Sequence, residues 1–130
     1  MPICSNPKER RIRIPVGDAA VILVFREYTQ QEFQEFMESR FSIGRRGKMK
    51  DNGMAARVKF ADRLLVDILA EDASGNPDYV TYIDPGSGEE RTLDPEVEGW
   101  QNYVNPSWKQ AAVLELETVD ARLEDQAVKN

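Results

Sequence analysis

The residues of this 130-residue chain that could do chemistry are mostly oxygen donors and basic side chains, and their spacing decides what they can do. Oxygen donors for a hard cation gather at two places, which are Asp51 with Asn52 and Asp84 with Glu89 and Glu90. The D-x-[DN]-x-[DN]-G spacing of a calcium loop is absent, and D-P-G-S-G-E-E has the composition of a polar turn. The sequence therefore predicts no metal site.

A glycine-rich basic segment covers Ser42–Gly53 and reads S-I-G-R-R-G-K-M-K-D-N-G. Glycine-rich basic segments can bind phosphate, but the P-loop pattern G-x-x-x-x-G-K-[ST] follows a strand and ends in Ser or Thr. This segment follows a predicted helix and lacks that last residue, so we expect no cofactor. Its glycines discourage regular structure. We predict a loop that becomes ordered on a partner protein, with Arg45, Arg46 and Lys48 as binding residues.

Histidine is absent from the chain, and cysteine occurs only as Cys4. Because histidine is the most frequent general base near neutral pH, its absence excludes Ser-His-Asp and Cys-His catalysis and most zinc sites. The basic residues near Cys4 favour its thiolate, but no second catalytic group accompanies it. We predict no catalytic residues and no enzymatic activity. An enzyme that uses only carboxylates and arginines stays as an alternative.

The formal charge of the chain is −6 and is unevenly placed. Basic residues dominate between Arg40 and Arg63, and acidic residues dominate from Asp84 onward. The negative charge argues against a nucleic-acid partner. The uneven distribution fits head-to-tail self-association or an internal contact between the two halves, and it also fits two solvated surfaces. We expect a homo-oligomer.

Targeting and membrane signals are missing from the sequence as given. No apolar run reaches the roughly 18 residues of a membrane span. The N-terminal residues M-P-I-C-S-N-P-K-E-R-R lack the apolar segment of a secretory signal. A single cysteine excludes an internal disulfide and fits a reducing compartment. We expect a cytoplasmic protein without a membrane partner.

The polar residues above must be positioned by strands and helices, and the first of these is a β-hairpin. Ile12 and Ile14 alternate with arginines, which is the period of a half-buried strand. Pro15 lacks an N–H and places this strand at a sheet edge. Gly17-Asp18 is a suitable two-residue turn, and the apolar run over residues 20–25 predicts a second strand that is covered on both faces.

A capped helix follows the hairpin. Thr29 begins T-Q-Q-E, in which the threonine hydroxyl and the glutamate can each satisfy a free backbone N–H of the first turn. Apolar residues recur after it at helical spacing, and they are Phe33, Phe36, Met37 and Phe41. Such a stripe is more often core than binding surface. Where the core leaves them exposed, Phe33, Met37 and Phe41 are candidate partner-binding residues.

The rest of the chain predicts an α+β fold, in which the hairpin precedes a small bundle of about three helices. A second helix is expected from Met54 to about Leu69, and a tryptophan-containing helix after Asn105-Pro106-Ser107. A second short hairpin is expected between these later helices. We divide the chain into a flexible tail, one globular domain and an acidic frayed end, over residues 1–10, 11–122 and 123–130.

Trp100 and Trp108 flank the turn N-Y-V-N-P-S. Two interpretations stay open for them. They anchor an interface, as aromatic residues often do, or they pack the turn against the core. We include both among the candidate partner-binding residues.

The order of elements resembles a family of phage proteins. A hairpin leads into F-R-E-Y-T-Q-Q-E-F-Q-E-F, a basic loop and second helix follow, and a C-terminal helix begins after N-P-S-W-K. In this order, and in size and acidity, the chain resembles the tail assembly chaperones of long-tailed bacteriophages and prophages, in outline from Arg13 to Glu117.

The resemblance implies a non-enzymatic role in a bacterial host. Such chaperones bind the tape measure protein, a long helical polypeptide with exposed apolar surface, and keep it soluble while the tail tube polymerises. This task requires an apolar helix face or groove and a charged exterior. The alternative is a structural virion component of the tail-terminator or connector type, which would form ring-like oligomers through the Ser42–Gly53 loop.

Overall fold

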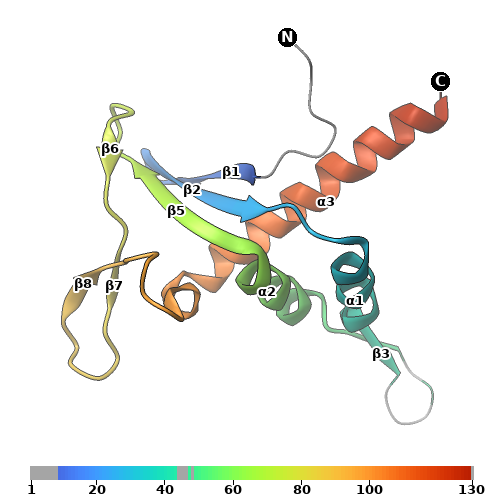
Figure 1. The fold of residues 1–130 in the computed structure, drawn as a ribbon, viewed down its shortest axis with the longest axis horizontal. Coiled ribbons are helices and arrows are strands. Elements are labelled where there is room, and N and C mark those ends of the chain that lie inside the picture. Colours follow the sequence, from blue (N-terminus) through green and yellow to red (C-terminus); the bar gives the residue numbers. More distant parts are fainter. Residues whose placement is uncertain (1–8, 44–46, 48, 130) are drawn as a thin grey trace.

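The computed structural model describes the backbone of residues 9–43, 47 and 49–129, and the side chains of residues 9–41, 47 and 50–118. Strands and helices follow one another as β1 (Glu9–Val16), β2 (Ala19–Arg26), α1 (Gln30–Arg40), β3 (Phe41–Ile43), β4 (Met49–Asp51), α2 (Gly53–Leu64), β5 (Leu65–Glu71), β6 (Pro77–Asp78), β7 (Thr81–Ile83), β8 (Glu90–Thr92), the short 3-10 helix η2 (Trp100–Tyr103) and α3 (Pro106–Lys129) (Figure 1). The fold is α+β, as the sequence predicts.

The N-terminal hairpin forms the start of a four-stranded antiparallel sheet. β1 and β2 pair across the turn at Gly17, whose φ of 60° favours glycine. The strand order is β1-β2-β5-β6, so β1 lies at an edge, as Pro15 predicts. β1 begins at Glu9, two residues inside the segment that we expected to be a tail.

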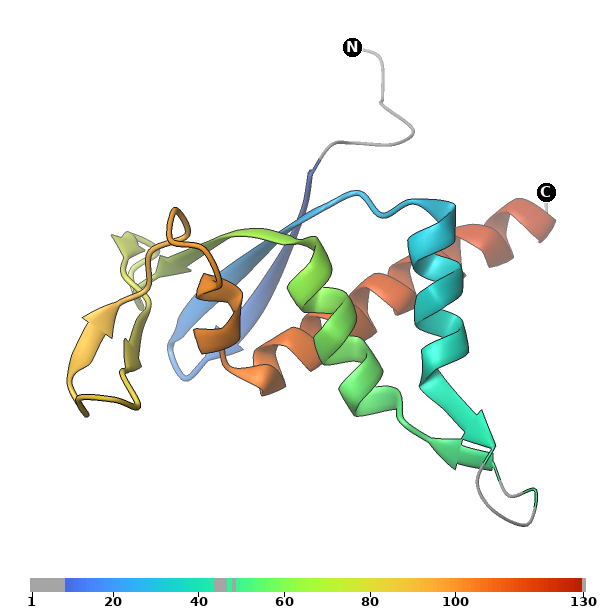
Figure 2. The same ribbon diagram turned by 60° about the horizontal axis from the view of Figure 1, so that its bottom comes forward.

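The core lies between this sheet and the helices. Ile12, Ile14 and Leu23 are buried on one face of the β1–β2 pair. α3 crosses behind this pair in Figure 1, and the turned view in Figure 2 places all three helices on the same side of the sheet. Buried residues of α2, α3 and η2 complete the core, among them Phe60, Leu64, Trp100, Val104, Ala112, Val113 and Leu116.

The second helix is shorter than expected. α2 ends at Leu64, and β5 begins at the next residue, so the predicted helix over residues 65–69 is wrong. β5 pairs with β2 and places Leu65 and Ile68 opposite Phe25 and Leu23. Apolar spacing of three and four residues suits a helix as well as a bulged strand. Residues 65–71 form a strand and not a helix because they pair with β2, which lies about 40 residues earlier in the chain.

The basic segment contains regular structure at both ends, in contrast to the predicted loop. β3 pairs with β4 from Phe41 to Asp51, and the amide of Asn52 donates to the carbonyl of Arg40 at 2.6 Å. Phe41, expected at the end of the α1 stripe, is therefore the first residue of β3. The predicted binding residues Arg45, Arg46 and Lys48 lie outside the described residues.

The last helix, α3, extends well past Leu116, the last buried residue among its described side chains. Ala112, Val113 and Leu116 of α3 are buried against the rest of the domain. The helix then continues to Lys129, past residue 122 where we expected fraying, and its end extends beyond the other elements in Figures 1 and 2. The second hairpin, β7 with β8, lies between α2 and α3 as predicted.

Candidate partner-binding site

Helix α1 divides its aromatic residues between two faces. Phe36 is 3% exposed and stacks on Phe60 of α2, with ring centroids 4.4 Å apart. Phe33, Met37 and Phe41 are 37%, 39% and 43% exposed. These three residues, at intervals of four, form an apolar strip that we call the α1 ridge. The core uses one residue of the predicted stripe and leaves the other three partly exposed.

Aromatic and cationic neighbours hold the α1 ridge in place. Tyr28 stacks on Phe33 with ring centroids 5.4 Å apart. The Arg40 guanidinium lies 5.5 Å from the centre of the Phe41 ring, and its Nη1 is 3.9 Å from the sulfur of Met37. Because both ends of the ridge already have neighbours, a partner would order few side chains on binding.

The N-terminus of α1 is fixed by a buried carboxylate, Glu32. Its amide donates to Thr29 Oγ1 at 3.1 Å, and the Thr29 amide donates to Glu32 Oε1 at 3.0 Å, which is the predicted capping box. Arg26 from β2 binds both carboxylate oxygens, and Arg63 Nε from α2 lies 2.9 Å from Oε2. Hydrogen bonding to Arg26, above all, lowers the pKa of Glu32 to about 2.

The C-terminus of α1 is fixed by a second carboxylate, Glu117 of α3. Arg40 Nη1 donates to one of its oxygens at 2.9 Å, and Arg57 Nε from α2 donates to the other at 3.0 Å. All three side chains are largely buried. The sequence suggests a contact between the basic and acidic halves, but it does not identify these three residues, because they lie up to 77 residues apart. The two carboxylates together lock α1 onto β2, α2 and α3.

A cavity of about 250 Å³ opens between α1 and α2. Its apolar wall comes from Phe36, Ala56 and Phe60, and charged or polar side chains form the remainder. A second, more open recess lies along α2 beside Met54 and Val58. Met54 is exposed. The exposed apolar surface of α1 and α2 is thus larger than the α1 ridge alone.

Both tryptophans pack at the core of the domain. Trp100 begins η2 and is 5% exposed, and it belongs to the core cluster. Trp108 is half-buried and packs against the same cluster. The prediction that Trp100 contacts a partner is wrong, because the side chain fills the space between η2 and the core. The packing interpretation holds for both residues.

The carboxylates considered for metal binding act as turn and ion-pair groups. Asp51 Oδ1 accepts the amide of Gly53 at 2.7 Å, and Asp84 Oδ1 accepts that of Gly86 at 2.8 Å. Arg91 Nε lies 3.1 Å from the other oxygen of Asp84. Among the described residues, no three His, Cys, Asp or Glu side chains are grouped so that they could hold a metal ion.

Comparison with known proteins gives no relative. No family model, curated protein or solved structure matches the chain. In the part of the chain that the structure describes, no helix has the length and apolar character to cross a membrane.

Proposed function

We propose that this protein binds an apolar helical segment of a partner and acts without catalysis, as a tail-assembly chaperone does. The observation that supports the proposal is the α1 ridge, three large apolar side chains that stay partly exposed while Phe36 between them is buried. Phe33 and Met37 lie one turn apart on α1, as required to match the face of a second amphipathic helix, and Phe41 continues this surface from the start of β3. Large exposed apolar side chains that share one surface favour an interaction site.

The resemblance to phage tail-assembly proteins suggests a tape measure protein as the partner. A tape measure protein offers long amphipathic helices, and the exposed residues beside Met54 provide further apolar contact for them. The locked ends of α1 support this role, because a rigid surface loses little conformational entropy on binding. We place this activity in the cytoplasm of a bacterial host.

The alternative, a ring-forming virion component, is favoured by a separate observation. The β3–β4 and β7–β8 hairpins lie at opposite ends of the molecule in Figures 1 and 2. In sequence, residues 41–51 carry four basic residues and one acidic residue, and residues 81–92 carry three acidic residues and one basic residue. Lys50 of the first hairpin and Glu89 and Glu90 of the second are exposed. Opposite charges at opposite ends suit head-to-tail contacts, which close into rings when the rotation between subunits permits.

Met37→Glu tests the chaperone proposal. We expect this variant to leave the melting temperature nearly unchanged, because Met37 is exposed, and to lose most of its ability to keep a coexpressed tape measure protein soluble. The new carboxylate lies beside Arg40, and burial of this charged pair against an apolar helix costs more than burial of Met37, so binding should weaken about tenfold or more. The soluble fraction of the tape measure protein measures the effect.

Val97→Glu is the matched control, since Val97 is more exposed than Met37 and lies in the turn before η2. It introduces the same charge away from α1 and should keep the tape measure protein soluble. Equal loss of solubility in both variants would show that net charge, and not the α1 ridge, matters.

A charge exchange tests the ring alternative. Lys50→Glu and Glu90→Lys should each weaken self-association about threefold, as expected for an exposed charge pair. The double variant should restore self-association, because opposite charges again face each other. Sedimentation velocity at low salt measures the oligomer. If the double variant associates no better than the single variants, the two hairpins do not meet.

A further inference from the structure

In the part of the chain that the structure describes, strand β1 has a neighbouring strand on one side only, which is β2. The two-residue turn makes Val16 and Ala19 a hydrogen-bonded pair, so Ile14 and Ile12 also direct their backbone groups toward β2. The N–H groups of Arg11 and Arg13 therefore point to the outer edge. Pro15 belongs to the same outward set, which explains why a residue without an N–H is accepted there.

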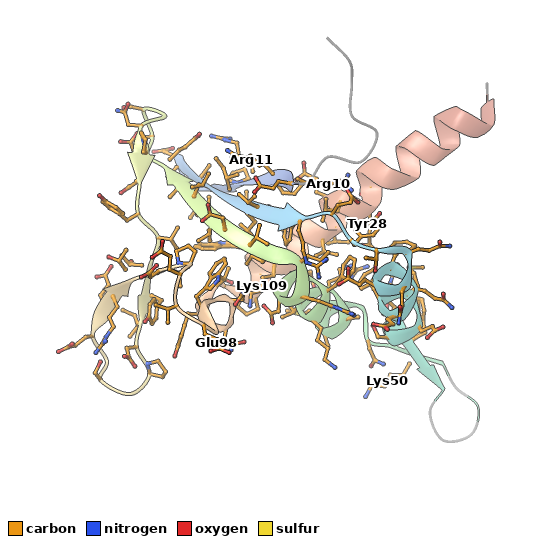
Figure 3. All side chains as sticks on the ribbon, viewed as in Figure 1. Arg10, Arg11, Tyr28, Lys50, Glu98 and Lys109 are labelled. Carbon is orange, nitrogen blue, oxygen red and sulfur yellow. The ribbon has the colours of Figure 1, made fainter. Side chains whose placement is uncertain are left out.

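The side chains of this edge are basic. Arg11 and Arg13 lie on the sheet face opposite Ile12, and in Figures 1 and 2 the helices lie on the other side of the sheet. Arg13 Nε is 3.6 Å from Glu71 of β5, which is a loose contact. Within the described part of the chain, Arg11 has no ion pair, and Figure 3 labels it at this edge. The edge thus offers free amides together with positive charge.

A second copy of the chain is a poor occupant of this edge. Antiparallel pairing of two β1 strands would bring the arginines of one copy next to those of the other. Like charges in cross-strand pairs destabilise a sheet. Basic residues on an edge strand are one of the ways in which proteins prevent pairing with themselves.

We propose that the edge of β1 binds an extended segment of a partner protein that carries acidic residues at alternate positions. The segment adds an antiparallel strand beside β1 and accepts hydrogen bonds from the amides of Arg11 and Arg13. Its carboxylates lie on the face of the two guanidinium groups, since residues two apart in a strand share a face. This site is separate from the α1 ridge and does not depend on the function proposed for it.

Fluorescein-labelled peptides of alternating Glu and Val, or of alternating Lys and Val, test the proposal by fluorescence anisotropy. We expect the full chain to bind the Glu-Val peptide and to bind the Lys-Val peptide at least about tenfold more weakly, with affinity falling as salt rises. Equal binding of both peptides would overturn the proposal.

Two substitutions at one position separate charge from backbone. Arg11→Gln keeps the outward N–H and should weaken binding of the Glu-Val peptide about threefold. Arg11→Pro also removes the N–H, as Pro15 does, and should weaken binding about tenfold or more. If the Pro variant binds like the Gln variant, no strand is added at β1.

Amide hydrogen exchange of the unaltered protein covers the case in which Arg11→Pro does not fold. Added Glu-Val peptide should slow exchange at the amides of Arg11 and Arg13. Slowed exchange confined to α1 would place the peptide on the ridge and contradict the proposal. Met37→Glu should bind the peptide as the unaltered protein does, so failure of the chaperone proposal leaves this result standing.

Discussion

Replacement of Phe36 by alanine is expected to lower the free energy of unfolding by about 3 to 5 kcal/mol. Phe36 is the buried aromatic residue of α1, and it stacks on Phe60 between the two helices. Removal of the ring would extend the cavity that already lies beside Phe36. Urea denaturation followed by circular dichroism measures the change.

Phe33→Ala is the control on the same helix. It removes the same side chain from a partly exposed position, so the expected loss is only about 1 kcal/mol. Its larger effect should be on partner binding. If Phe33→Ala destabilises the protein as much as Phe36→Ala, then the α1 ridge belongs to the core and is not free to bind.

Glu32→Gln is expected to produce the second large loss, about 3 kcal/mol at pH 7. The pKa of Glu32 falls from its ordinary 4.5 to about 2 in the folded protein. Each unit of pKa difference corresponds to about 1.4 kcal/mol, which gives this magnitude. The Glu32 side chain is 7% exposed, but those of Arg26 and Arg63 are 40% and 48% exposed. Solvent therefore screens these ion pairs in part, and the expected loss is smaller than the roughly 3.5 kcal/mol of the full shift.

The pH dependence has a definite sign. A lowered folded-state pKa means that the charged form stabilises the fold above pH 4.5, and that this contribution is lost as pH falls toward 2. Stability of the unaltered protein should therefore decrease over this range more steeply than that of Glu32→Gln. Glu35→Gln is the control, since Glu35 binds Arg63 on the surface and should matter much less.

The sequence predicts well those features that depend on near neighbours. The hairpin needed only the alternation around Ile12, the Gly17-Asp18 turn and the apolar strand after it, and the pairs of β1 and β2 follow in order. The capping box at Thr29 and Glu32 is likewise local, and it forms as expected. Pro15 predicts an edge strand, because proline has no backbone N–H to donate to a neighbouring strand.

Features that depend on distant residues were beyond the sequence. Leu65 and Ile68 are buried in a strand or in a helix, so only the pairing with β2 distinguishes the two. The sharing of Glu117 by Arg40 and Arg57 leaves no local pattern. The separation of Phe36 from Phe33 and Met37 also depends on where α2 lies. The sequence therefore identifies the apolar residues of the candidate site, and the structure shows which of them are exposed.

Helix α2 ends at Leu64 and β5 begins at Leu65, and this direct junction limits where the chain can accept insertions and deletions. With no loop between them, an inserted or deleted residue would turn every later side chain of β5 to the opposite face of the sheet. The turn over residues 73–75, in contrast, is exposed and can change length. Sequences that share this fold should therefore align without insertions or deletions across residues 60–71.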